Sequence, residues 1–108
     1  MEKGVNRPWI VCKLSGEFLA LTNPETAHGV AALAHDINEL SGRYRCALVI
    51  GAGNILRGSS LSTALGVRTR AAHYAGMTAT LVNGIVLSDL LTQAGCKNSI
   101  VSALSMPA

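Results

Sequence analysis

Short apolar runs alternate along the chain with longer segments in which apolar residues recur at helical spacing. Strands are predicted at residues 8–14, 46–50 and 99–104, and the unbroken apolar run of the second is typical of a parallel strand buried on both faces. Helices are predicted at residues 26–40 and 69–94, each closely followed by a glycine. The order strand, helix, strand, helix, strand indicates an α/β fold with a parallel sheet, right-handed crossovers and helices on its faces.

A glycine-rich turn follows the second strand, in the sequence VIGAGNILRG at residues 49–58. Residues 51–66 are rich in glycine and serine and are predicted to form a loop. Open backbone N–H groups and little side-chain bulk let such a turn wrap around an anion, while Arg57 adds a fixed positive charge. Phosphate is therefore the expected ligand.

Two well-known phosphate-binding motifs do not fit this turn. A dinucleotide-binding turn has the spacing GxGxxG and an acidic residue about 20 positions later, but no Asp or Glu lies between Glu39 and Asp89. A P-loop has GxxxxGK followed by Ser or Thr, and GNILRGSS at residues 53–60 lacks the lysine. KLSGE at residues 13–17 is a second turn in which a strand leads into a glycine. Because the carboxyl ends of neighbouring parallel strands face the same crevice, Lys13 can supply the missing positive charge.

Four segments, taken together in order, are more specific than any single glycine motif. They are KLSGE at 13–17, VIGAGNILRG at 49–58, GMTATLVNGIVLSDLL at 76–91 and VSALSMP at 101–107. They resemble the amino-terminal half of the bacterial uridylate kinases, in the amino acid kinase superfamily. The resemblance implies a three-layer α/β sandwich with a mainly parallel sheet, of which residues 1–108 form the amino-terminal part.

The activity that the resemblance implies is transfer of the γ-phosphoryl group of ATP, with Mg²⁺, to UMP, which forms UDP in pyrimidine nucleotide biosynthesis. Two residues are implied as catalytic, Lys13 and Arg57, which would compensate charge during the transfer. The residues that match the family's ATP and phosphate turns are Lys13, Leu14, Ser15, Gly16, Gly53 and Arg57. The residues on the UMP side are Gly51, Ala52 and His73. The resemblance implies no protein ligand to a metal.

Two positions depart from the family pattern. Ala52 replaces the middle glycine of three, which is tolerable only with a negative φ and brings a methyl group near the acceptor phosphate. His73 stands where the family has an aspartate that binds the sugar of UMP, and a histidine cannot supply that carboxylate. The family's second half supplies the adenine pocket and most uracil contacts, so we expect little kinase activity from these residues alone.

Two other functions stay open beside a uridylate kinase. A superfamily member acting on a carboxylate or carbamate is disfavoured by GNILRG, whose asparagine and arginine resemble uridylate kinases specifically. A non-catalytic assembly or regulatory protein that kept the fold is favoured by His73 and by the short length of 108 residues.

The composition indicates a surface that other protein covers. The chain is 49% hydrophobic and only 14% charged, so we expect the rest of a longer protein, or further subunits of a homo-oligomer, to cover part of it. The net charge of +3 is too small to indicate nucleic acid as a partner. Five arginines and no acidic residue lie between Leu40 and Ser88, which suits nucleotides as ligands; the arginines are Arg43, Arg45, Arg57, Arg68 and Arg70.

Smaller features point to a cytoplasmic protein. Three cysteines far apart, Cys12, Cys46 and Cys96, predict reduced and mostly buried thiols, and no signal peptide or membrane span is expected. His28 and His35 lack a third metal ligand. The apolar residues Met77, Leu81 and Ile85 are predicted to form the buried face of the long helix.

Overall fold

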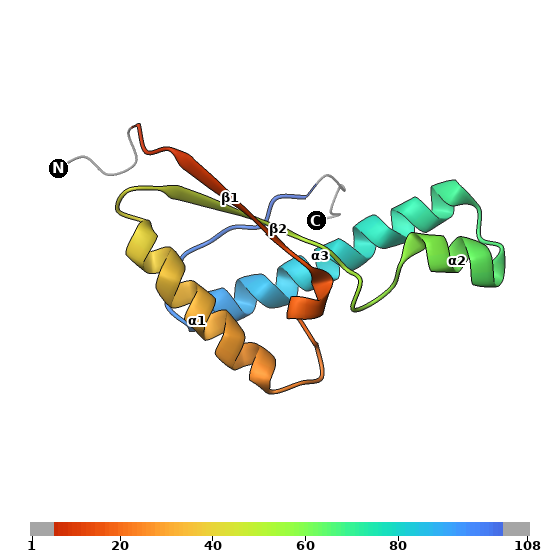
Figure 1. Ribbon diagram of the computed structural model, residues 1–108, viewed down its shortest axis with the longest axis horizontal. Helices are drawn as coiled ribbons and strands as arrows, with labels where there is room; N and C mark the ends of the chain where they lie inside the picture. The colour runs from red at the N-terminus through yellow and green to blue at the C-terminus, as the bar shows by residue number, and fades with distance from the viewer. Residues whose placement is uncertain (1–5, 103–108) are drawn as a thin grey trace, which may run out of the picture.

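The computed structural model describes residues 6–102. Its elements are β1 (Trp9–Leu14), a short 3-10 helix (Gly16–Phe18), α1 (Glu25–Leu40), β2 (Arg45–Ile50), α2 (Gly58–Leu65) and α3 (Thr69–Gln93), as labelled in Figure 1. The first two predicted strands and both predicted helices begin and end within one residue of these bounds. The α/β fold class predicted from the sequence is therefore confirmed.

The two strands form a parallel sheet whose carboxyl ends coincide. Trp9 is the register partner of Arg45 at one end, and Leu14 is the partner of Ile50 at the other. The Gly51 N–H continues the ladder by donating to the Leu14 carbonyl at 3.0 Å. Both glycine turns therefore leave the sheet at the same edge.

One face of the sheet carries the hydrophobic core. Every second strand residue turns inward, and Leu14, Leu48 and Ile50 contact a buried cluster from α1 and α3. That cluster consists of Leu19, Val30, Ala34, Leu87, Leu91 and Cys96. The residues of the opposite parity, Trp9, Val11 and Val49, are 61%, 67% and 51% exposed, so within residues 6–102 the helices cover one side of the sheet.

The predicted loop at residues 51–66 is wrong in its second half, where α2 forms. Leu61 and Leu65 lie among serines, and this serine-rich composition favours a loop when it is read from the sequence alone. The helix ends at Gly66, which has a φ of +69° and whose N–H caps the last turn. A glycine of left-handed conformation just past a helix is a common C-terminal signal, and here it marks a short helix.

The predicted third strand is also wrong for residues 99–102, which form no strand; residues 103 and 104 lie outside the described residues. Figure 1 shows the segment after α3 returning beside β2. A cavity of about 620 Å³, lined by β2, α3 and residues 96–102, lies along this side of β2. Because Ile100 and Val101 are 43% and 93% exposed, their apolar side chains do not hold the segment against the strand.

The buried face of α3 differs from the predicted one. Met77 and Ile85 are 41% and 47% exposed, so the predicted buried face is wrong for these two residues, whereas Leu81 is half-buried. The buried residues are Ala72, Ala79, Asn83, Leu87 and Leu91. Four of them recur every fourth residue and form a continuous stripe. The buried stripe could not be identified from hydrophobic spacing, because the helix is apolar on most sides and the stripe includes an asparagine.

The helix α3 is, by length and composition alone, long and apolar enough to cross a membrane. The same test is passed by core helices of globular proteins. Here the stripe of α3 packs against α1 and the sheet, and Leu87 and Leu91 are each 4% exposed. One stripe of the helix therefore belongs to the core of this fold, while 22% of its most apolar window is buried in all.

Candidate functional site

The two glycine turns touch each other at the carboxyl edge of the sheet. A Cβ atom added to Gly16 would lie 2.5 Å from the Gly53 nitrogen and 2.8 Å from the Ala52 carbonyl carbon. These are backbone atoms, so no side chain larger than hydrogen fits between the turns. The prediction that both turns share one edge of the sheet is confirmed.

Arg57 lies directly over the glycine-rich turn. A Cβ atom added to Gly53 would lie 2.8 Å from Nη2 of Arg57 and 3.0 Å from Oε1 of Glu17. Nη2 of Arg57 donates to Oε1 of Glu17 at 2.5 Å, which joins the residue next to Gly16 to the arginine of the second turn. The site therefore holds a guanidinium above a glycine backbone, with a carboxylate as its present partner.

Hydrogen bonds keep Glu17 ionised. Its own backbone N–H and the hydroxyl of Ser15 are the largest influences and lower the pKa of Glu17; desolvation raises it by less, and the charge and hydrogen bond of Arg57 lower it by less still. Both members of the pair are more than half exposed. An anion from solution can therefore reach Arg57 and compete with Glu17.

The remaining residues of the first turn have different surroundings. Lys13 is exposed and shares its register position with Val49, on the face of the sheet away from the core and one residue before the strands end. Leu14 is half-buried in the core, so only its backbone borders the turn. Ser15 is exposed, and its carbonyl accepts from the Phe18 N–H at 3.1 Å.

The second turn accepts its alanine without backbone strain. Within residues 6–102, Asn6 is the one non-glycine residue with positive φ, so Ala52 has the negative φ that an alanine requires. Its carbonyl accepts from the N–H groups of Ile55 and Leu56 at 2.8 and 3.0 Å. Ala52 is 8% exposed, and the carbonyl bonds close the turn that leads to Arg57.

His73 is exposed near the start of α3. Its neighbour Ala72 packs beside Gly58, where an added Cβ would lie 3.4 Å from the Ala72 oxygen. The start of α3 therefore borders the residue after Arg57. No hydrogen bond or ion pair within residues 6–102 joins His73 to the glycine turns, so the structure brings it near the site without direct contact.

Sequence reasoning missed two amides that join the turns to α3. Asn83 is fully buried, and its Nδ2 donates to the Gly51 carbonyl at 2.9 Å and to Oδ1 of Asn54 at 2.7 Å. Nδ2 of Asn54 donates in turn to Oδ1 of Asn83 at 3.2 Å and to the Leu19 carbonyl at 2.6 Å. The available signal was a polar residue within the every-fourth-residue stripe of α3.

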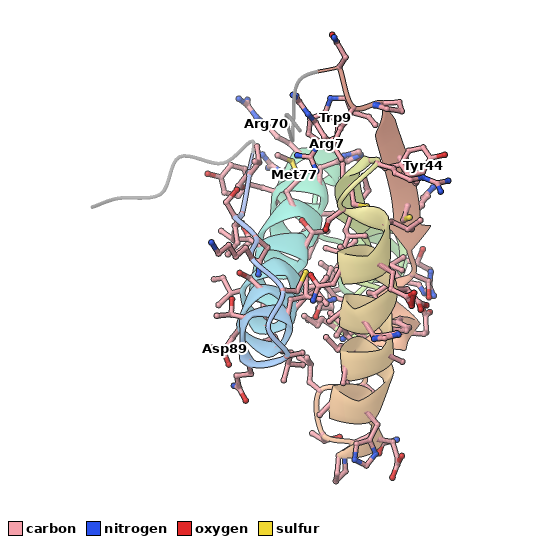
Figure 2. The ribbon with its side chains drawn as sticks, turned by 90° about the vertical axis from the view of Figure 1, so that its left-hand side faces the viewer. Arg7, Trp9, Tyr44, Arg70, Met77 and Asp89 are labelled. Atoms are coloured by element: carbon pink, nitrogen blue, oxygen red, sulfur yellow. The ribbon has the colours of Figure 1, made fainter. Side chains whose placement is uncertain are left out.

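The five arginines of the middle of the chain do not gather at one place. The guanidinium of Arg45 lies over the Trp9 ring at 5.7 Å, at the edge of the sheet where the strands begin. Figure 2 shows Arg7, Trp9 and Tyr44 at this same end of the molecule. Arg57 is thus separated from Arg45 by the length of β2, and the two arginines cannot hold one small anion.

The site suits phosphate better than a bare metal ion. Backbone of two glycine turns and one guanidinium offer donors, which bind anions. Among the described residues no group of three or more histidine, cysteine or acidic side chains could hold a metal ion. His28 and His35 lie on α1, each paired with an exposed glutamate at 3.1 and 2.9 Å.

The thiols fit the predicted chemistry only in part. Cys12, Cys46 and Cys96 are all free, as predicted. Cys96 is buried, while the other two are half-buried. Burial is the main cause that raises the pKa of the Cys96 thiol, with a smaller contribution from Cys46. A thiol of raised pKa forms little of the nucleophilic thiolate at neutral pH. Cys96 packs in the hydrophobic cluster and is therefore a core residue.

Comparison with known proteins connects this geometry to one family. The model of the amino acid kinase family matches residues 8–108. A uridylate kinase of Tropheryma whipplei is 39% identical over 101 residues, which are 90% of this chain and 42% of that protein. A uridylate kinase of Mycoplasmoides gallisepticum is 33% identical over 105 residues, which are 94% of this chain and 44% of that protein.

A solved structure agrees with the sequence relatives. The crystal structure of UMP kinase from Ureaplasma parvum matches 84% of this chain and 39% of its own, with a TM-score of 0.68 and 32% sequence identity. The chain thus spans less than half the length of the relatives it matches. The resemblance to uridylate kinases that was found in the sequence is confirmed.

Proposed function

Because this chain belongs to the amino acid kinase family, we propose that it forms the amino-terminal, phosphate-binding part of a kinase domain that converts UMP into UDP with ATP. The relatives named above are uridylate kinases or a UMP kinase. The activity belongs to a nucleoside monophosphate kinase of pyrimidine nucleotide biosynthesis, and residues 1–108 supply one part of the domain. The three free cysteines support a cytoplasmic location.

The contact between the two glycine turns, with Arg57 above Gly53, is the observation that carries this proposal. Phosphoryl transfer requires alignment of donor and acceptor phosphates and compensation of their charge, with little covalent chemistry from the protein. Two glycine backbones that touch can approach neighbouring phosphates, and Arg57 can bind them bidentately. Bound Mg²⁺ would neutralise part of the phosphate charge.

The roles are divided between the turns. On the ATP side, Lys13 and Arg57 stabilise charge on the transferring phosphoryl group, and the backbone of Leu14, Ser15, Gly16 and Gly53 surrounds the donor phosphates. On the UMP side, Gly51 and Ala52 border the acceptor phosphate, and His73 lies toward the nucleoside. His73 cannot accept hydrogen bonds from two ribose hydroxyls as a carboxylate does. It therefore contributes less to the recognition of the acceptor nucleoside than an aspartate would.

Binding of ATP and of inorganic tripolyphosphate to the 108-residue chain tests the phosphate site. We expect weak, salt-sensitive binding that Lys13→Ala and Arg57→Ala each weaken about ten- to hundredfold, because a charge-assisted contact contributes about 1.5–3 kcal/mol. Arg43→Ala is the matched control, since Arg43 is exposed just before β2 begins, at the end of the sheet opposite the turns. Titration calorimetry measures each affinity. Equal losses in all three variants would remove the assignment of the site.

Release of ADP in the presence of ATP and UMP tests the enzymatic part. We expect little turnover from the 108-residue chain alone, because it spans less than half the length of the uridylate kinases that it matches. Robust turnover that depends on UMP would show that these residues contain the whole catalytic site. Phosphate binding without turnover, also when the chain is lengthened to match its relatives, would favour a non-catalytic assembly or regulatory role.

A further inference from the structure

Asn83 is the buried polar residue of α3, and its side chain is fully engaged. Both Nδ2 hydrogens are donated, one to the Gly51 carbonyl and one to Asn54, and its Oδ1 accepts from Asn54. A buried amide that lacked such partners would cost free energy, so its place among apolar residues is maintained by these bonds. The stripe of α3 therefore has one position whose partners all lie in the glycine-rich turn.

Asn54 extends the connection to the first turn. Its second Nδ2 hydrogen goes to the Leu19 carbonyl, just past the 3-10 helix that contains Gly16 and Glu17. Its Oδ1 lies 2.6 Å from where a Cβ of Gly16 would be. Two side chains thus join three segments that are far apart in sequence: the end of the first turn, the second turn and the middle of α3.

A glycine-rich turn needs such support to be an effective anion site. Glycines give the turn many accessible backbone conformations, and fixing one of them on binding costs conformational entropy. Contacts that hold the bound conformation beforehand remove that cost and increase affinity. Of the Asn83 bonds, the one to the Gly51 carbonyl is placed to do this, because it fixes the first residue after β2.

We infer that Asn83 is a positioning residue, which acts through Gly51 and Asn54 to hold the second turn in its phosphate-binding conformation. The identity of the ligand as phosphate rests on the proposed function, whereas the hydrogen bonds of Asn83 to the turn do not depend on it. A purely structural asparagine would affect the stability of the whole fold equally. A positioning asparagine affects the turn and its ligand more than the rest of the core.

The test compares Asn83→Leu with Leu91→Ala. Both residues lie on the buried stripe of α3, and Leu91 packs in the hydrophobic cluster two turns further along the helix. We measure the melting temperature, the affinity for inorganic tripolyphosphate and the amide hydrogen exchange of residues 51–56. Asn83→Leu should weaken tripolyphosphate binding roughly tenfold, the loss of one firm hydrogen bond, and should speed exchange in residues 51–56 first. Leu91→Ala should lower the melting temperature with little change in either.

The results of these measurements distinguish a positioning role of Asn83 from a purely structural one. If both variants lose affinity in proportion to their loss of melting temperature, Asn83 is structural only and the inference is overturned. If the parent chain binds no tripolyphosphate, the proposed function fails, while the exchange of residues 51–56 still shows whether Asn83 holds the turn. If Asn83→Leu does not fold, Asn83→Ala removes the same hydrogen bonds to Gly51 and Asn54 without adding bulk, with the same expected results.

Discussion

Glu17 is the side chain with which an anion would compete for Arg57. Its carboxylate occupies one edge of the guanidinium at 2.5 Å, above Gly53. The two charges are exposed, so their attraction is weakened by water and salt, and a phosphate with more charge can displace the carboxylate. Glu17 therefore competes with anions for Arg57 but does not block their access to it.

Glu17→Gln should tighten the binding of sulfate about two- to fivefold at neutral pH, because it removes the competing charge of an exposed pair. Since the pKa of Glu17 lies below its usual 4.5, the pair is intact at neutral pH and is lost only as the pH falls through this lowered value. The parent chain should therefore bind sulfate more tightly on acidification below pH 4.5, whereas Glu17→Gln should not.

Titration calorimetry with sulfate at neutral and acid pH measures both effects. Glu39→Gln is the control, since Glu39 forms an exposed pair with His35 on α1. An unchanged affinity in Glu17→Gln would mean that the carboxylate does not compete with anions. The same pair stabilises the fold only above the pKa of Glu17, so its contribution is lost as the pH falls through that value.

At the scale of elements, the contact between the turns depends on Gly16. Gly16→Ala should lower stability by about 1–3 kcal/mol, because the new methyl group would meet backbone atoms at 2.5 and 2.8 Å that cannot rotate away. Gly76→Ala is the matched control, since an added Cβ there has no atom within 4 Å and alanine favours a helix by about 0.5–1 kcal/mol. Thermal unfolding should show opposite signs for the two variants. A neutral Gly16→Ala would mean that the turns can move apart.

The sequence predicted those elements whose signal is local. β1, β2, α1 and α3 are set by apolar runs and helical spacing, and the shared edge of the two turns follows from parallel pairing. The helix α2 was missed because its serines favour turns as much as helices. A third strand was expected where residues 99–102 form none, since a strand needs ladder partners that no single segment can reveal.

The candidate site divides in the same way. The proximity of Gly16, Gly53 and Arg57 could be predicted, because each lies in a turn that follows one of two parallel strands ending at the same edge. The burial of Asn83 could not, because its partners lie 29 and 32 residues earlier in the chain and become neighbours only when α3 packs against the turns. Likewise, Met77 and Ile85 fitted a buried face by spacing, but the packing direction of an apolar helix is set by tertiary contacts.

At the scale of the whole molecule, the outer face of the sheet is an exposed apolar surface without a role in the core. Trp9, Val11 and Val49 are each more than half exposed there, although strands are normally covered on both faces in parallel sheets. The matched relatives are more than twice as long as the segment that this chain matches. Further chain, or further copies of this chain, can cover such a face.

For the 108-residue chain alone, we predict self-association through this face, because exposed apolar side chains gain free energy when a second copy removes them from water. The double change Val11→Lys and Val49→Lys should shift the chain toward the monomer, since it places charges on both strands of the exposed face. The double change Ala64→Lys and Leu65→Lys adds the same charge on α2, where both residues are exposed, and should leave association unchanged. Sedimentation velocity over a range of concentrations measures the three proteins side by side. A parent chain that stays monomeric at the highest concentration would contradict the prediction, and equal dissociation by both double changes would mean that net charge, and not the sheet face, controls assembly.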